Sequence, residues 1–395
     1  MNSKKKISRR EFLSQLGPSL LTLGLAGSCS RLSNQLSKPR TNPLDSPLNL
    51  TKIRGLKIYS GESIDLLESF QTTKELLSQK HFLYEFDAQI GKTLIHHAPL
   101  PAHSILCSQI PGNPYVGLPL RQKLAFLFDP KNPANSQMIE PIKNHFFYGH
   151  GTFTQDQKHF LCSESQHDST DGRISVRDSK NGKILETLSS YGAGPHEFKF
   201  TADFKTLIAC NAQEDIYKGT SSLCYIEFPS GKLLHKFSTP DPKFHFRHLD
   251  LDSKSRAFIG PIRGLAMEDD KKDLYPTPYL IGLEHGIQRF QAPDWVKSRY
   301  LNHQLLSVAL SPDAKSGFTT CPNKSSFISW NVDTLEFQSV TELKRASGLI
   351  WIDEASAMIV NSADSKTKAI ASRAITNIDL AKIQLTGPHL SISKN

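Results

Sequence analysis

The chain has 395 residues, of which 38% are hydrophobic and 22% charged, and its formal charge is +9. This hydrophobic share supports a large packed core and excludes wholesale disorder, while 23 Gly and 23 Pro disfavour a coiled coil. Residues 1–40 hold eight basic residues and one acid, so the other 39 basic and 37 acidic residues nearly balance. Charge therefore gives little support to a nucleic-acid partner, and we predict none.

The N-terminal segment has the features of an export signal. A lysine run and the pair Arg9-Arg10 precede a short apolar stretch over residues 16–26. Paired arginines before such a stretch are typical of a twin-arginine signal, and the stretch is too short to anchor in a bilayer. We therefore predict a signal peptide over residues 1–28 and a periplasmic location.

The segment after the signal is predicted to be a tether, and whether its first residue, Cys29, carries a lipid stays open. Small residues precede Cys29, as in a lipoprotein, but Ser28 shifts the expected register, so lipidation of Cys29 stays open. Residues 29–50 are rich in Ser, Asn and Pro, which predicts a flexible tether. We expect a monomer that meets a membrane only through a lipid on Cys29.

Cysteine usage favours buried thiols. Cys107, Cys162, Cys210, Cys224 and Cys321 remain beyond the signal, and an odd number cannot all pair within one chain. Three of them lie in short apolar runs, where a free thiol packs as a small hydrophobic group. No CxxC spacing occurs, which disfavours a zinc ribbon or a thioredoxin-like redox site.

The most informative pattern is an internal repeat over residues 51–395. Short alternating runs recur at intervals of 40 to 59 residues, and each is followed by a turn and a second apolar run. The runs begin at His103, His150, His196, His248, Ser307, Ser347 and His389. A period in the forties filled with short strands predicts an all-β, seven-bladed β-propeller.

Turn chemistry and the two ends of the repeat region support this fold. The first and second runs are joined by segments containing Gln155-Asp156, Ala202-Asp203 and Pro312-Asp313, which suit tight hairpins. The run from His389 has nothing after it to complete a blade, whereas residues 51–98 offer outer strands. We therefore predict that the C-terminal strand closes the N-terminal blade, which removes an open sheet edge. Residues from about 261 to 300 are predicted to form a long loop over one face.

Several segments resemble a known family. FYGHGTFTQDQKHFLCSES, YGAGPHEFKFTADFKTLIACN, FRHLDLDSKSRAFIG and LLSVALSPD are similar to the bacterial domain-of-unknown-function family 1513, over roughly residues 55–392. The resemblance implies twin-arginine export and a WD-repeat-like propeller. Members are often encoded beside iron-uptake proteins and haem oxidoreductases, which implies iron-uptake or redox partners.

The repeat also predicts a ring of histidines. Inner strands of a propeller surround its channel, and five of the seven residues that begin them are His: His103, His150, His196, His248 and His389. Neutral imidazoles suit a transition metal such as iron or copper, whereas calcium would need oxygen ligands. Within the ring, His150, His196 and His248 from consecutive repeats are the first choice. Glu197, Tyr148 and Arg247 flank it and are candidates for orienting a ligand.

Three functions stay open at this stage. The first is a periplasmic module that binds a transition metal or metal complex at the channel mouth and assists iron uptake or redox chemistry. The second is a metal-dependent propeller enzyme, an oxidoreductase or lyase, in which His196 and Glu197 take part. The third is a protein-interaction scaffold in which the histidines form structural hydrogen bonds. No catalytic residue can be named from the sequence.

Overall fold

The computed structural model describes residues 55–61, 72–90, 92–166, 170, 172–212, 221–263, 275–352, 357–362, 368–371, 374–379 and 389–393. The predicted signal peptide (1–28), the tether (29–50) and Cys29 lie outside these residues. Strands dominate the described part, beside the short helices α2 (Thr73–Leu77) and α3 (Asp294–Tyr300) and the 3-10 helix η3 (Pro322–Lys324). Within the described part, no helix has the length and apolar character needed to cross a membrane.

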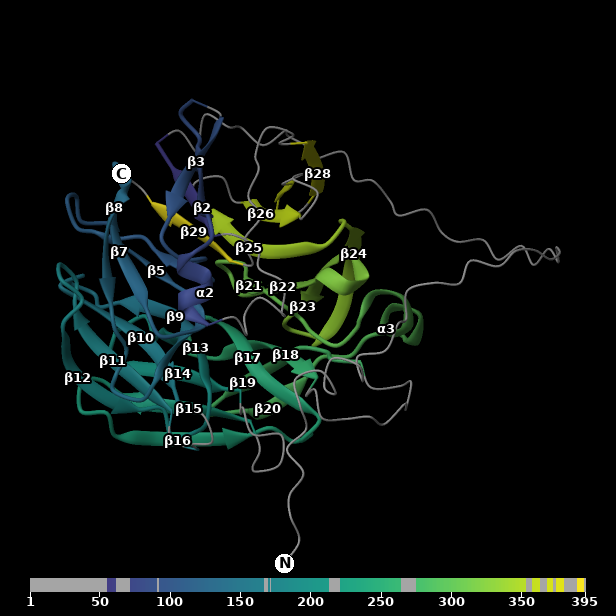
Figure 1. Ribbon diagram of the computed structural model, residues 1–395. Coiled ribbons are helices and arrows are strands. Elements are labelled where there is room, and N and C mark those ends of the chain that lie inside the picture. Colours follow the sequence, from purple (N-terminus) through teal and green to yellow (C-terminus); the bar gives the residue numbers. More distant parts are fainter. Residues whose placement is uncertain are drawn as a thin grey trace, which may run out of the picture. The chain divides into compact units, whose positions relative to one another are not determined.

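The described strands form seven antiparallel sheets, and six of these each contain four strands that follow one another closely along the chain (Figure 1). The first two contain β4 (Ser104–Leu106), β5 (Tyr115–Leu118), β7 (Ala125–Asp129) and β8 (Asn132–Ile139), and then β9 (Phe146–Phe153), β10 (His159–Ser165), β11 (Arg173–Asp178) and β12 (Ile184–Ser189). The short strand β6 (Leu120–Gln122) pairs with β9 and extends this second sheet.

The other four of these six sheets follow in chain order. Two of them contain β13 (Pro195–Phe200), β14 (Thr206–Asn211), β15 (Ser222–Glu227) and β16 (Leu233–Ser238), and then β17 (Phe244–Leu251), β18 (Ala257–Arg263), β19 (Tyr279–Gly282) and β20 (Gly286–Arg289). The last two contain β21 (Val308–Leu310), β22 (Ser316–Cys321), β23 (Ser326–Asn331) and β24 (Glu336–Glu342), and then β25 (Ala346–Ile352), β26 (Ala357–Ser362), β27 (Lys368–Ala371) and β28 (Ala374–Asp379).

The seventh sheet joins the two ends of the repeat region. It has the order β29 (Leu390–Ser393), β1 (Lys57–Ser60), β2 (His81–Asp87) and β3 (Lys92–Ala98). Lys57 lies opposite Ser393, and Ser60 lies opposite Leu390. Figure 1 shows β29, in yellow, beside the purple and blue strands of this sheet. The C-terminal strand therefore completes the N-terminal sheet, as the repeat predicts.

The sheets are arranged in a closed cycle. Their first strands, which we call the inner strands, contact one another in the order β4, β9, β13, β17, β21, β25, β29 and again β4. Hydrophobic clusters lie between neighbouring sheets: one joins Leu161 of β10 to Leu207 of β14, and another joins Ile58 of β1 to Ile359 of β26. The prediction of an all-β propeller is confirmed.

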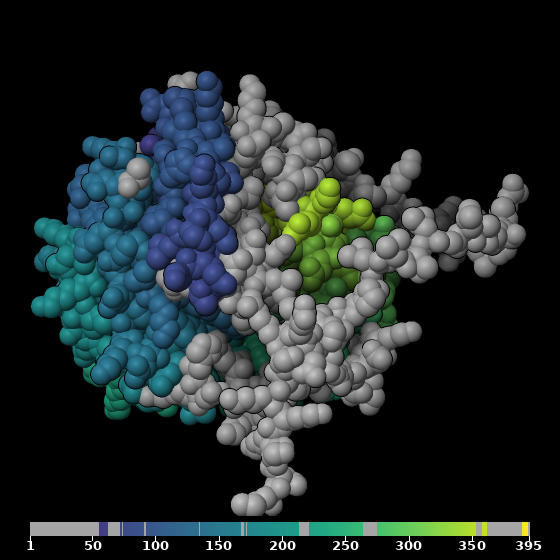
Figure 2. Space-filling view, in the orientation of Figure 1, coloured from purple at the N-terminus to yellow at the C-terminus, as the bar shows by residue number. Residues whose placement is uncertain are grey.

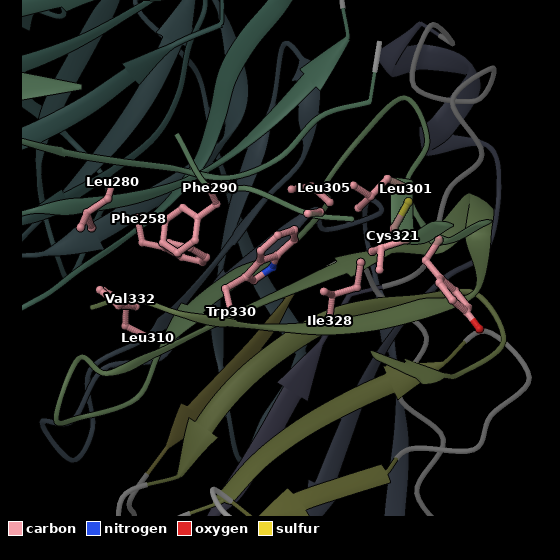
Figure 3. Packing of buried hydrophobic residues seen from close by; sticks show 13 residues of the cluster. Phe258, Leu280, Phe290, Leu301, Leu305, Leu310, Cys321, Ile328, Trp330 and Val332 are labelled. Carbon is pink, nitrogen blue, oxygen red and sulfur yellow. The ribbon is translucent and has the colours of Figure 1, made fainter. Parts of the chain in front are cut away.

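Side chains between the sheets are closely packed. In the cluster shown in Figure 3, Trp330 of β23 lies between Phe290 and Ile328, and its ring centroid is 5.9 Å from that of Phe290. On the face shown in Figure 2, the purple and blue residues of the N-terminal sheet lie beside the next sheet, in agreement with the contact between β3 and β8. The core is therefore divided among the interfaces between sheets.

The predicted hairpin turns are present between the first and second strands. Asp156 accepts hydrogen bonds from the side chain of Thr154 and from the backbone N–H of Lys158. The residue between them, Gln157, has a φ of 52°. The same arrangement recurs around Asp203 and Asp313. In each turn the aspartate adds side-chain hydrogen bonds to a backbone one, which in the first turn runs from the N–H of Gln157 to the carbonyl of Thr154.

One predicted element is wrong. The segment from about 261 to 300 was expected to be a long loop, but the end of β18, both strands β19 and β20, and helix α3 lie within it. Val296 of α3 is fully buried in the cluster around Trp330. β19 has only four residues and directly follows Pro276 and Pro278. Prolines are uncommon in strands, so a strand this short beside them is not evident from the sequence.

The cysteines match the expectation for free thiols. All five described cysteines are unpaired, and Cys162, Cys210, Cys224 and Cys321 are buried, while Cys107 is partly buried. Burial raises the pKa of the Cys321 thiol to about 11 and that of Cys162 further. These thiols stay protonated at neutral pH and therefore act as core side chains.

A buried ion pair allows a stability prediction. The Glu164 carboxylate accepts from the Arg177 guanidinium at 2.7 Å and from the backbone N–H of Ile142 at 2.6 Å, and both charged side chains are at most 1% exposed. We expect Arg177→Met to lower the free energy of unfolding by about 3–5 kcal/mol, because it leaves the carboxylate buried without its partner.

Chemical denaturation followed by circular dichroism measures this loss. The double variant Glu164→Leu/Arg177→Met removes both charges and should recover most of the stability. Equal losses in the single and the double variant would show that the ion pair is not the reason.

Candidate metal centre

All five predicted histidines lie at the inner strands. His150, His196 and His248 lie within β9, β13 and β17, while His103 and His389 directly precede β4 and β29. The two remaining ring positions are Ser307, directly before β21, and Ser347 within β25. His150, His196 and His248 are buried, and His103 and His389 are partly buried. Five separate sheets supply these imidazoles.

Strand irregularities aim these residues. The pairing register shifts once in each of the strands β9, β13 and β17. In β9 the shift falls at residues 148–150, which lie opposite Ser163. In β13 it falls between Pro195 and Phe198, and in β17 between Phe246 and His248. A β-bulge adds one residue to a strand and redirects the side chains beside it. Bulges therefore explain why the repeat aligns imperfectly in sequence, with Glu197 rather than His196 matching His150.

The five imidazoles, which we call the histidine cluster, converge on one point. Eight of their pairs have ring centroids between 4.6 and 5.7 Å apart. Two sets of three histidines each have their ligand atoms within 4.8 Å of one another. One set is His103, His150 and His196, and the other is His150, His248 and His389. His150 belongs to both sets. The sequence ranked the three consecutive histidines first, but the closure of the ring brings His103 and His389 equally close.

Hydrogen bonds within the cluster leave several ring nitrogens available. His248 Nδ1 lies 3.3 Å from Glu197 Oε2, and His389 Nδ1 lies 3.4 Å from Ser307 Oγ. His389 Nε2 lies 3.2 Å from His103 Nε2. Among the described residues, buried His150 Nε2 and both nitrogens of His196 have no hydrogen-bond partner. An unsatisfied buried polar atom costs about 1–3 kcal/mol, so this concentration favours a function over a purely structural role.

The three flanking residues have different positions. Glu197 holds His248 through Nδ1 and also accepts from the backbone N–H of Leu249 at 3.1 Å. Tyr148 is buried, and its ring packs edge-on against His196 at 5.3 Å. Arg247 is the extra residue of the β17 bulge and is partly exposed. Glu197 therefore fits an orienting role most directly, because it fixes which nitrogen of His248 carries the proton.

Burial keeps the histidine cluster neutral. Desolvation first, and then the charges of neighbouring groups including Arg247, hold the pKa values of His103, His150 and His196 well below the usual range. The pKa of His389 falls to about 3 for the same reason. Burial alone would raise the pKa of Glu197, but the hydrogen bond with His248 and the charge of Lys199 lower it to about 2. The site thus combines lone pairs with a permanent carboxylate.

These pKa directions predict acid sensitivity of the metal-free protein. The unfolded chain binds protons on histidine below about pH 6.5, while the folded cluster does not. The stabilising contribution is therefore complete above about pH 6.5 and is lost as the pH falls towards the folded-state values. We expect the free energy of unfolding to drop by roughly 2 kcal/mol or more between pH 7.5 and pH 5.0, since a histidine with the pKa of His389 alone accounts for about 2 kcal/mol.

Urea unfolding in the presence of a chelator measures this drop at the two pH values. The variant His389→Gln, which cannot titrate there, should show a smaller difference. A pH difference as large in His389→Gln as in the original chain contradicts the assignment to the cluster.

A cavity of about 320 Å³ adjoins the cluster. All seven inner strands contribute to its lining, directly or through the residue before the strand, so it lies on the central channel. His150, His248 and His389 line it, together with the charged residues Glu197 and Lys199. The cluster therefore has one side open to a space that can hold a small molecule.

The donor set fits a transition metal. Metal–nitrogen bonds of about 2.0–2.1 Å place two imidazole ligands of one ion roughly 2.9–3.4 Å apart. The ligand atoms of each set of three lie within 4.8 Å of one another, and the Nε2 atoms of His103 and His389, one from each set, are 3.2 Å apart. His248 is already oriented by a carboxylate, as metal-bound histidines usually are. Neutral nitrogen donors suit iron, copper, zinc or nickel.

One feature of the site could not be found from the sequence repeat. Lys199 and Asp250 form an ion pair at 2.8 Å between β13 and β17, and both line the cavity. Asp250 lies two residues after His248, and Lys199 lies two residues after Glu197, a spacing that places each pair of side chains on the same face of its strand.

Comparisons with known proteins give a family and a fold. Residues 121–387 match the model of a family described as protein of unknown function (DUF1513). No curated protein matches the chain. A solved structure titled Kuenenia stuttgartiensis hydrazine synthase is similar with a TM-score of 0.59 and 11% sequence identity, over 74% of this chain and 90% of that one. At this identity the likeness concerns the fold alone.

Proposed function

Because the chain belongs to the DUF1513 family of proteins of unknown function, we propose its function from the histidine cluster: it binds a transition-metal ion or a small metal complex. Iron or copper is the metal that we propose, and the accessory role is in iron uptake or redox chemistry. The observation that supports this most is the convergence of five neutral imidazoles from five sheets, with three buried ring nitrogens that have no partner among the described residues.

The surrounding fold suits such a role. We count each sheet as one blade and propose a seven-bladed propeller with the cluster in its central channel. Ligands held by separate blades are fixed by the packing between blades, so the site is preorganised. The twin-arginine signal over residues 1–28, periplasmic location and lipid on Cys29 are proposals from the N-terminal sequence, and they agree with loading of the metal before export.

A metal-dependent enzyme is the second candidate. The cavity beside His150, His248 and His389 favours it, because a catalytic metal needs an open coordination position and space for a substrate. The carboxylate of Glu197 also lines this cavity and could accept a proton from a substrate. An interaction scaffold with structural histidines is the third, and it would predict that no metal binds.

Metal analysis of the exported protein tests the proposal. The full chain should be isolated from the periplasm, analysed for metals, stripped with a chelator and titrated with Fe(II), Cu(II), Zn(II) and Ni(II). We expect one tightly bound ion per chain. Failure of every metal to bind with a micromolar or lower Kd would contradict the proposal and favour the scaffold.

A further inference from the structure

The central cavity has a charged wall and, opposite it, a wall that combines apolar residues with Ser104, Ser307 and Ser391, which we call the apolar wall. Glu197, Lys199 and Asp250, from the neighbouring strands β13 and β17, supply the charged side. Residues such as Val308, Leu349 and Leu390, from β21, β25 and β29, supply apolar surface. Its volume of about 320 Å³ is at the small end of ligand pockets, which span roughly 300–1,000 Å³.

The carboxylates of the charged wall are largely occupied. Asp250 accepts from Lys199 Nζ at 2.8 Å through one oxygen and from the backbone N–H of Leu310 at 2.8 Å through the other. Glu197 uses Oε2 for His248 and Leu249. These bonds link β13 to β17 and β17 to β21, so they fix the wall in place.

Lys199 is the group with hydrogen-bonding capacity to spare. An ammonium has three N–H donors, and within the described part of the chain Asp250 is its only hydrogen-bond partner. Its charge acts on His248, His389 and Glu197, which places it near the cluster. Two donors therefore remain for a ligand in the cavity.

The formal charge of the cavity indicates which charge a ligand there should carry. Two carboxylates and one ammonium give the cavity a formal charge of −1, which favours uptake of a metal cation. A divalent ion at the histidine cluster changes this to +1, and a monoanion then neutralises the site. An ammonium and a metal ion side by side are a strong site for a carboxylate, since both form charge-assisted contacts with its oxygens.

From these observations we propose that the cavity binds a small organic carboxylate, whose charged group lies between the metal of the cluster and Lys199 and whose apolar body lies on the opposite wall. This inference rests on the proposed metal site. It adds the chemical class of the ligand: a monoanion with a short apolar body, in preference to a neutral analogue of the same shape.

Titration of the cobalt-loaded full chain with benzoate tests the inference. Co(II) gives a visible spectrum that changes when an exogenous ligand enters its coordination shell. We expect a saturable change with benzoate, tighter binding of benzoate than of formate because of the apolar wall, and no comparable change with benzyl alcohol. Equal binding of benzyl alcohol, or of formate, would contradict the proposed ligand class.

Substitution of Lys199 locates the carboxylate. Lys199→Met should weaken benzoate binding at least 10-fold while cobalt stoichiometry stays at one, because a hydrogen bond to a charged group contributes about 1.5–3 kcal/mol. Lys199→Arg should retain most of the affinity. The exposed turn residue Lys205 offers a matched control, and Lys205→Met should bind as the original chain does.

A second variant guards against misfolding. Lys199→Met/Asp250→Asn removes both charges of the ion pair and keeps an oxygen for the N–H of Leu310, so it should fold even if the single variant does not. It should show the same loss of benzoate affinity. Undiminished benzoate binding in this variant overturns the assignment to Lys199.

The two proposals fail in different ways. A chain that takes up no cobalt contradicts the metal site, and with it the ligand. A chain that binds cobalt with a spectrum that benzoate does not change contradicts only the ligand assigned to the cavity.

Discussion

His150→Ala is expected to weaken metal binding by roughly 100-fold or more. His150 is the one residue shared by the two sets of ligand atoms, so its loss impairs either arrangement. Even residues that merely orient a ligand typically contribute 10- to 100-fold to metal affinity, and removal of a ligand should cost at least as much. Competition with a chromophoric chelator measures the affinity.

The other histidines show which set holds the ion. If His103, His150 and His196 hold the ion, His103→Ala should weaken metal binding as much as His150→Ala does, and His389→Ala should change the affinity little. If the other set holds the ion, His389→Ala should give the large loss and His103→Ala the small one. His97, which is exposed on β3, is the matched control, and His97→Ala should leave the affinity unchanged. A similar small loss for all of these variants would contradict a histidine site.

Removal of β29 is expected to abolish cooperative folding of the ring. Deletion of residues 390–395 removes a strand paired with β1, and it removes Leu390, which is buried between this sheet and the sheet of β25 and β26. It also removes contacts to the sheet of β4 and β5. The latter include hydrogen bonds from Tyr115 to Ser393 and from Ser391 to the backbone of Ile105. The loss amounts to roughly 5 kcal/mol or more, comparable to the whole stability of an ordinary domain.

Thermal unfolding followed by circular dichroism measures this effect. Deletion of residues 394–395 alone leaves β29 intact and should leave the midpoint unchanged. A sharp transition at the original midpoint in the longer deletion would show that β29 is not needed to close the ring.

The propeller was predictable because its signals are local. An aspartate at the third position of each hairpin turn and alternating apolar residues on either side specify a strand pair without reference to the rest of the chain. The strands and the helix after Pro261 were not predicted, for the opposite reason. Its strands are short and bounded by prolines, and Val296 is buried only because a neighbouring sheet lies against α3.

The candidate site was predictable in composition but not in geometry. Repetition alone placed five histidines at equivalent positions. Their grouping depends on bulges and on ring closure, which brings His389 to His103 across 286 positions of sequence. No periodic pattern signals the ion pair of Lys199 with Asp250, because it joins two repeats with different residues at matching places.

The pairing of β29 with β1 also has a kinetic consequence. These strands are more than 300 residues apart, so their pairing is among the most entropically demanding contacts of the chain and is expected late in folding. His389 directly precedes β29, so an ion bound by His389, His150 and His248 would hold β29 in place beside β1. Release of the ion and opening of the ring would then be one event, so the lifetime of the bound metal would report how often the two ends of the propeller separate.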